Sequence, residues 1–196
     1  MAGALSVSTS KSGDCLRGHF LLAMPCLSEG IFSQSITYIC EHGEAGAMGI
    51  VINRPLDLSV DEIFKHLQIT TLRDYSAEAV MAGGPVQMDH GFVLHRYCEH
   101  AWEASLKVTN EVTLTTSRDI LRAIANDDGP SEHLIALGYA GWAAGQLEQE
   151  LAENSWLTLP GNSDIIFSTP VDHRMEAAAA LLGVDMNLIS GQAGHA

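Results

Sequence analysis

The sequence predicts one α+β domain, in which strands dominate the first part of the chain and helices become frequent later. Short hydrophobic runs with β-branched residues, bounded by Gly, Pro or Asn, recur along the 196 residues. Amphipathic stretches that begin with helix-capping residues separate some of these runs. No internal repeat or linker divides the chain, and its length and 46% hydrophobic content fit a single core.

Nine runs have the length and composition of strands. They span residues 19–24, 35–40, 49–53, 79–81, 91–95, 112–115, 133–137, 156–159 and 164–167. The opening residues are rich in Ser, Gly and Ala. We therefore expect a flexible tail over residues 1–14 and a single domain over 15–196.

Four helices are expected between or after these strands. Ser59 as N-cap and Glu62 at the third helical position form a capping box that starts the first helix. The others are expected over 118–125 after a Ser117 cap, over about 141–153, and from Thr169-Pro170 to a C-terminal Gly183.

The charge balance excludes some classes of partner. Ten Lys and Arg residues face 24 Asp and Glu residues, which gives a net charge of −14. Such a balance counts against generic binding to nucleic acid or to an anionic membrane, because phosphate contacts need clustered cations. After residue 123, Arg174 is the single cation of these two types, so the C-terminal part is expected to face water or a basic protein.

The cysteine pattern indicates a reducing compartment. Cys15, Cys26, Cys40 and Cys98 form no CxxC pair, and the first residues do not have the basic and apolar regions of an export signal. No stretch approaches the 18 uncharged apolar residues that a membrane span needs. We expect reduced thiols, a cytoplasmic location and no contact with a membrane.

Cys40 and His42 are the first candidates for chemistry. Residues two apart on a strand share a face, so the imidazole of His42 could favour the thiolate of Cys40. His95, at the end of its own strand, could face the same pocket and serve as a base. The alternative is a small buried cysteine beside a surface histidine.

Zinc is a weaker possibility. Cys98 and His100 repeat the Cys-x-His pattern of Cys40 and His42. The spacing differs from that of known zinc sites, and a domain of this size needs no metal. We expect neither a metal nor a cofactor.

Asn53 and Arg54 suggest a binding surface at the end of a core strand, just before Pro55, which is expected to stop the pairing of that strand. The planar guanidinium of Arg54 could hold a carboxylate or phosphate, or instead form a salt bridge or cap a carbonyl group. Gly83 and Gly84 follow another strand and could admit a ligand or simply form a turn.

A glycine-rich stretch from Leu137 to Glu148 completes this surface. Gly138, Gly141 and Trp142 lie between a strand and a helix, an order seen in loops that bind anions. The spacing matches neither a dinucleotide nor a P-loop motif. Tight packing of the helix on its strand explains these glycines equally well.

Taken together, several motifs resemble the YqgE/AlgH family of bacterial proteins over nearly the whole chain, from about Arg17 onward. The motifs lie at 22–25 (LAMP), 38–42 (YICEH), 46–55 (GAMGIVINRP), 83–86 (GGPV), 91–95 (GFVLH) and 138–148 (GYAGWAAGQLE). Two departures are visible. Glu29-Gly30 stands where the family usually has Asp-Pro, and His90 replaces a common Arg, a cation that a ligand or partner could have used.

The resemblance implies a bent, mixed sheet that closes toward a pseudo-barrel, with helices packed outside. It implies no established activity, although the AlgH branch is labelled a transcriptional regulator of alginate production. Cys40 and His42 fall on the family's Cys-x-His positions.

Two functions follow as expectations. The first is a cytoplasmic binding or regulatory protein that acts through a protein partner, because its acidic surface is unsuited to gripping DNA. The second is a thiol enzyme or redox sensor that uses Cys40, with His42 or His95 as base and the amides near Gly83-Gly84 as an oxyanion pocket.

Overall fold

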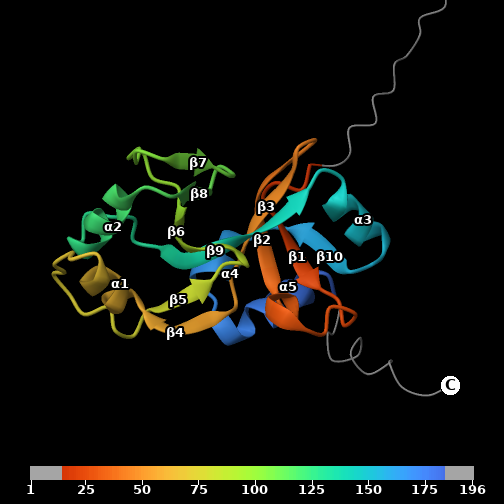
Figure 1. Ribbon diagram of the computed structural model, residues 1–196, viewed down its shortest axis with the longest axis horizontal. Helices are drawn as coiled ribbons and strands as arrows, with labels where there is room; N and C mark the ends of the chain where they lie inside the picture. The colour runs from red at the N-terminus through yellow and green to blue at the C-terminus, as the bar shows by residue number, and fades with distance from the viewer. Residues whose placement is uncertain (1–14, 184–196) are drawn as a thin grey trace, which may run out of the picture.

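Ten strands of the described residues pair into one curled sheet (Figure 1). The computed structural model describes residues 15–183, so the tail predicted for 1–14 and the last 13 residues of the predicted domain lie outside them. The strands are β1 (His19–Ala23), β2 (Ile36–Gly43), β3 (Gly46–Val51), β4 (Pro55–Ser59), β5 (Ala79–Ala82), β6 (Val86–Arg96), β7 (Ser105–Lys107), β8 (Val112–Thr115), β9 (His133–Ala143) and β10 (Trp156–Pro160). The helices are α1 (Val60–His66), α2 (Arg118–Ala125), α3 (Gln146–Ala152), α4 (Ser163–Phe167) and α5 (Arg174–Leu181), with 3-10 turns at Gly30–Phe32 and Val171–His173.

The sheet is mixed and bends into a half-barrel. Its strand order is β10-β1-β2-β3-β9-β6-β8-β7, and β5 pairs with β9 beside this path. The β5–β9 pair is parallel and the other pairs are antiparallel. Arg17, just before β1, donates to the carbonyl groups of Lys107, the last residue of β7, and of Val108, and so links the two sides of the curl. The expected α+β fold with a bent mixed sheet is confirmed.

The inner face of the half-barrel holds the main core. β1, β2 and β3 contribute one wall, and β6, β8 and β9 contribute the other, while α4 and α5 pack onto the same cluster. Fully or almost fully buried members of this core include Phe20, Tyr38, Ile50, Leu94, Ala136 and Ile166. Because α4 and α5 cover the inner core, α1, α2 and α3 are the helices of residues 15–183 that lie on the outer face.

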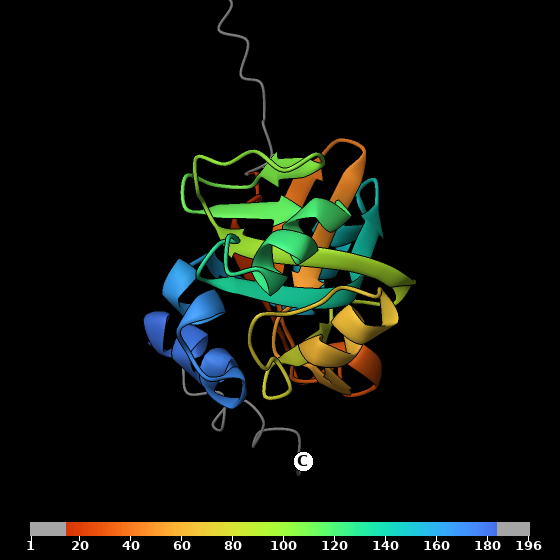
Figure 2. The same cartoon turned by 90° about the vertical axis from the view of Figure 1, so that its left-hand side faces the viewer.

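Two smaller cores lie on the outer face, at opposite ends of the molecule (Figure 1). α1 and α2 cover one of them, which contains Phe64, Val93 and Ile124. α3 covers the other, which contains Trp142 and Trp156. Figure 2 shows α1 and α2 in front of the sheet, with β6 crossing between them. Their outer position is the one that the family resemblance implied.

Several helix signals act as the sequence predicts. Ser59 accepts a hydrogen bond from the Glu62 amide, and the Glu62 carboxylate accepts one from the Ser59 amide, so the capping box is present. α2 has the expected bounds, but Ser117 does not cap it; the Asp119 carboxylate accepts from Ile120 N–H instead. The last helix, α5, begins at Arg174 after a 3-10 turn, later than the start expected at Thr169-Pro170. It ends before Gly183, whose backbone has φ +67°.

Three local predictions are wrong. Residues 164–167 form α4 rather than a strand, because Asn162 Oδ1 caps the amide of Asp164 at 2.8 Å. The helix expected over 141–153 begins only at Gln146, since β9 continues to Ala143 by pairing with β3. Pro55 begins β4 instead of ending the sheet pairing.

Candidate functional site

Cys40 and His42 lie on opposite faces of β2. The register of β2 against β3 shifts between Ile39 and Glu41, where β2 holds one residue more than its partner. An extra residue of this kind reverses which of the following side chains face each side of the sheet. Cys40 therefore packs in the inner core, whereas His42 points outward to Glu148 on α3. The expectation that they share a face is corrected by this bulge.

The surroundings of Cys40 do not activate its thiol. Cys40 is completely buried, and its Sγ donates to the carbonyl oxygen of Tyr38 at 3.7 Å. Burial raises the pKa of the Cys40 thiol far above its ordinary range, and the Glu41 carboxylate raises it further. A nucleophilic cysteine needs a lowered pKa and a base within reach. The geometry therefore favours the alternative of a small core residue.

The His42 ring holds three chain segments together. The Leu16 amide donates to Nδ1 at 3.0 Å, so Nε2 carries the ring proton and donates to Glu148 Oε1 at 2.8 Å. Leu16 precedes β1, and Glu148 belongs to α3. Through these contacts, His42 on β2 positions the segment before β1 and helix α3.

His95 is buried on the outer face of β6. Its Nδ1 donates to the carbonyl oxygen of Arg96 at 3.0 Å, and its Nε2 lies 2.9 Å from Thr115 Oγ1. Burial lowers the pKa of His95, although the Arg96 carbonyl opposes that effect. Its neighbour Leu94 faces the inner core with Cys40, so His95 faces the opposite side. His95 and Cys40 do not share a pocket, contrary to expectation.

Asn53 and Arg54 bind the backbone ahead of β2. Asn53 accepts from Ile36 N–H at 3.0 Å and donates to the carbonyl oxygen of Gln34 at 2.9 Å, so its side chain extends the strand ladder. The Arg54 guanidinium donates to the carbonyl oxygen of Ser33. This is the carbonyl-capping role that the sequence allowed.

Gly83, Gly84 and Gly138 allow two backbones to touch. A Cβ atom on Gly83 would stand 2.3 Å from the Gly138 oxygen, and one on Gly84 would stand 2.0 Å from the Tyr139 carbonyl carbon. Gly138 has φ +72° inside β9, so it bends the strand there rather than forming an anion-binding loop. These contacts leave no space at the three glycines for a ligand.

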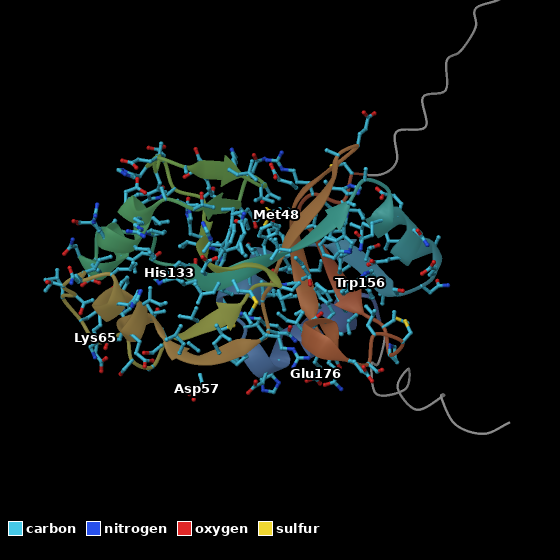
Figure 3. The ribbon with its side chains drawn as sticks, viewed as in Figure 1. Met48, Asp57, Lys65, His133, Trp156 and Glu176 are labelled. Carbon is cyan, nitrogen blue, oxygen red and sulfur yellow. The ribbon has the colours of Figure 1, made fainter. Side chains whose placement is uncertain are left out.

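Gly141 and Trp142 also lie on β9, and Trp142 is covered by α3. The Glu150 carboxylate accepts hydrogen bonds from the indole nitrogens of Trp142 at 2.9 Å and Trp156 at 2.7 Å. Trp156 lies among the side chains between β10 and α3 (Figure 3). Trp142 is only 6% exposed, so it is part of a hydrophobic core and not of an open binding surface.

A cleft of about 720 Å³ opens elsewhere, between α1, α2 and the outer face of β6 and β9. Its apolar lining comes from Ile63, Leu67, Val93, Leu121, Ile135 and Leu137. Its polar lining comes from His66, Gln87, Asp89, His90, Ser117 and Arg118. An apolar concave surface with a few polar groups is the usual form of a binding site.

The charged groups of this cleft differ in their partners. Asp89 lies 2.9 Å from the His90 ring, and that contact lowers the pKa of the Asp89 carboxyl group. Arg118 is exposed and forms no ion pair with any residue in the range 15–183. The guanidinium of Arg118 is therefore the cation that the cleft offers to a ligand.

Among the charged residues of this cleft, only His90 stood out in the sequence, as a departure from the family pattern. Local signals were present, because Arg118 and Leu121 are three apart on a predicted helix and so share one side of it. The sequence did not show that α1 and α2 stand next to each other over β6. Only the tertiary arrangement forms the cleft.

Residues 15–183 contain neither a metal-binding cluster nor a helix suited to span a membrane. They contain no group of three or more His, Cys, Asp and Glu side chains that could hold a metal ion. Cys98 donates to the carbonyl oxygen of His100 at 3.8 Å. No helix in the same range is long and apolar enough to cross a membrane.

Comparison with known proteins places this arrangement in a family. The model of the AlgH-like family matches residues 20–187. A UPF0301 protein of Saccharophagus degradans is 54% identical over 181 residues, which cover 92% of this chain and 89% of that protein. A UPF0301 protein of Thioalkalivibrio sulfidiphilus is 56% identical over 177 residues, covering 90% of this chain and 95% of the other.

Solved structures agree with these matches. The solution structure of the AlgH protein from Pseudomonas aeruginosa superposes with a TM-score of 0.77 at 46% identity, covering 95% of this chain and 99% of that one. A crystal structure of a Corynebacterium diphtheriae protein shares the fold, with a TM-score of 0.70 at 19% identity, covering 88% of this chain and 90% of that one. The family match over most of the chain and the similarity to these relatives show that the chain belongs to the AlgH-like family.

Proposed function

We propose that this chain is a cytoplasmic regulatory protein that binds a segment of a partner protein in the cleft between α1, α2 and β6. The observation that carries the proposal is the cleft itself, which has an apolar floor and a polar rim. Met88, next to the rim residues Gln87 and Asp89 in the chain, is 67% exposed. Apolar pockets with polar margins are typical of protein interfaces.

The charge of the chain supports a protein partner rather than DNA. The net charge is −14, and Arg174 at 7% exposure is hidden from any partner. A protein that holds DNA through its backbone needs several cations on one face. If the chain regulates transcription, as the label on the AlgH branch suggests, it would do so by binding another protein.

A site-specific photo-crosslinking experiment in living bacteria tests this function. Thr116 is exposed and lines the cleft, so a photoreactive amino acid there is expected to trap one partner, with adducts at one segment of it. The matched control is Asp57, which is exposed on β4 and lies outside the cleft (Figure 3). Equal adducts at both positions, or none at Thr116, would contradict the proposal.

A gel-shift assay tests the same proposal against direct DNA binding. We expect no specific complex with DNA at low salt. Tight, sequence-specific binding with a steep salt dependence would show that the chain contacts DNA itself.

A further inference from the structure

Part of β6 beside the cleft has no strand partner. Val86 pairs with Tyr139 and Gly91 pairs with Leu137, so residues 87–90 have no position of their own in the strand ladders of the described chain. All four residues are exposed. Gln87 has φ +49° there, so residues 87–90 form an exposed bulge of β6, and three of them, Gln87, Asp89 and His90, line the cleft.

The side chains of this segment and of the cleft suit an extended peptide. Gln87, Asp89 and His90 line the cleft, and Met88 is exposed beside them. In a bound strand, alternate side chains point to opposite sides, so one of them would enter the apolar floor. The polar residues of the bulge and the apolar floor of the cleft would then contact the same peptide in different ways.

Charge decides which peptides fit. Arg118 has no acidic partner in the range 15–183, and the Asp89 carboxylate is bound to the His90 ring. A planar guanidinium binds a carboxylate through two parallel hydrogen bonds. An acidic side chain beside the apolar anchor would therefore complete the ion pair that Arg118 lacks.

We infer that the cleft recognises a short extended segment of its partner in which a bulky apolar residue lies next to an Asp or Glu, with the apolar side chain on the floor and the carboxylate on Arg118. This inference rests on the proposed function and adds the chemistry of the partner segment.

Gly91 offers a way to block the cleft without disturbing the fold. It lines the cleft, and a Cβ atom there would meet no atom within 4 Å. Gly91 is two residues before Val93 in an unbroken register, so a side chain at position 91 would point to the same face as Val93. Gly43 has equally open surroundings in the β2–β3 hairpin, which makes Gly43→Leu the matched control for Gly91→Leu.

Arg118 has a matched control on its own helix. Arg122 lies one turn further along α2, is also exposed and forms no ion pair with residues 15–183, but it does not line the cleft. Arg118→Gln and Arg122→Gln thus remove the same charge from the same helix. Any difference between them reports on the cleft and not on net charge.

The experiment selects binders of the full chain from a displayed library of short random peptides and measures the affinity of the selected peptides by fluorescence anisotropy. We expect selected sequences to share an apolar residue next to Asp or Glu. Gly91→Leu should abolish their binding, and Arg118→Gln should weaken it about tenfold or more, the usual effect of losing a hydrogen bond between charged groups. Gly43→Leu and Arg122→Gln should bind as the unchanged protein does, and all four variants should keep its thermal unfolding temperature within a few degrees.

The outcomes separate the two proposals. Peptides that bind in the cleft, as shown by loss with Gly91→Leu, but lack an acidic residue or bind equally well to Arg118→Gln would overturn the inference and leave the proposed function intact. The same holds if a small apolar carboxylate alone binds as tightly as the peptides. Binding that is unaffected by Gly91→Leu, or a library that yields no binder, would contradict both proposals.

Discussion

Cys40 and His42 are separated by one residue and yet point to opposite faces of the sheet, because β2 contains an extra residue between Ile39 and Glu41. The thiol packs in the inner core, and the imidazole binds Glu148 on the outside. A pattern that suggests a thiol–imidazole pair in the sequence therefore supplies two unrelated structural contacts. The reactivity of the cysteines follows from this separation.

We predict that Cys40 resists alkylation at neutral pH while Cys15 and Cys26 react. Cys40 is completely buried, so an alkylating reagent cannot reach it, and its raised thiol pKa leaves little of the reactive thiolate. Cys15 and Cys26 are exposed. Iodoacetamide treatment of the native protein followed by peptide mass spectrometry measures each site. Rapid labelling of Cys40 would restore the thiol hypothesis.

Because the Cys40 thiol is buried, we also predict that the folded protein loses stability at alkaline pH. Above about pH 8.5 an unfolded thiol loses its proton, whereas the folded Cys40 keeps it, so rising pH favours unfolding by up to about 1.4 kcal/mol per pH unit. The buried Tyr38 hydroxyl, whose pKa burial also raises, adds the same effect at higher pH. Urea unfolding between pH 8 and 10 should show a shallower pH dependence for Cys40→Ala than for Cys98→Ala. Equal slopes would contradict the raised pKa.

Local sequence signals predicted the elements whose start or end depends on neighbouring residues. The Ser59–Glu62 capping box and the strand at 112–115 are examples, since both appear as predicted. Signals failed where a distant strand decided the outcome. Residues 141–143 remain extended because they pair with β3, although the sequence is also suited to a helix.

The candidate site was less predictable than the fold for the same physical reason. Arg54 and Trp142 are common types of functional residue, but a backbone carbonyl group and the Glu150 carboxylate, respectively, already accept hydrogen bonds from them. Gly138 is explained by the approach of Gly84, a contact between residues 54 positions apart. The cleft depends on α1 and α2 lying on either side of β6, and no local pattern encodes that placement.

Glu150 is predicted to stabilise the core under α3. Its carboxylate accepts from the indole nitrogens of Trp142 and Trp156, and Glu150→Ala would leave both donors without an acceptor. We expect a loss of about 1–3 kcal/mol in the free energy of unfolding, measured by urea titration with tryptophan fluorescence. Glu153→Ala, at the exposed position directly after the same helix, is the control, with an expected change within about 0.5 kcal/mol. Similar values for both variants would show that the two indoles do not depend on Glu150.

Gly84 and Gly91 should respond oppositely to substitution. A Cβ atom on Gly84 would collide with the Tyr139 backbone at 2.0 Å, and its φ of +158° is rarely adopted by other residues. Gly84→Ala is therefore expected to prevent folding or to lower the unfolding temperature by more than about 10 °C, whereas Gly91→Ala should change it by only a few degrees. Circular dichroism during heating measures both. A well-folded Gly84→Ala protein would mean that β5 and β9 can separate, and would reopen the idea of a ligand at these glycines.

Arg174 is predicted to attach α5 to the end of β3 through a buried charge. Its guanidinium donates to the carbonyl oxygens of Ile52 and, at 3.1 Å, of Thr169, and no carboxylate in the range 15–183 pairs with it. Burial lowers the pKa of Arg174 to about 10, so the group is still charged at neutral pH.

Arg174→Ala should cost about 2–4 kcal/mol in unfolding free energy, because it leaves two carbonyl groups without donors and opens a cavity. Arg174→Met keeps most of the volume and supplies no donor, so the difference between the two variants measures the cavity, and the remaining loss measures the hydrogen bonds. The exposed Arg122→Ala controls for the change in net charge, and urea unfolding at pH 7 supplies all three values. If Arg174→Met were as stable as the unchanged protein, the buried charge would offset its own hydrogen bonds, and α5 would be held by the apolar contacts of Ala178 and Ala179 alone.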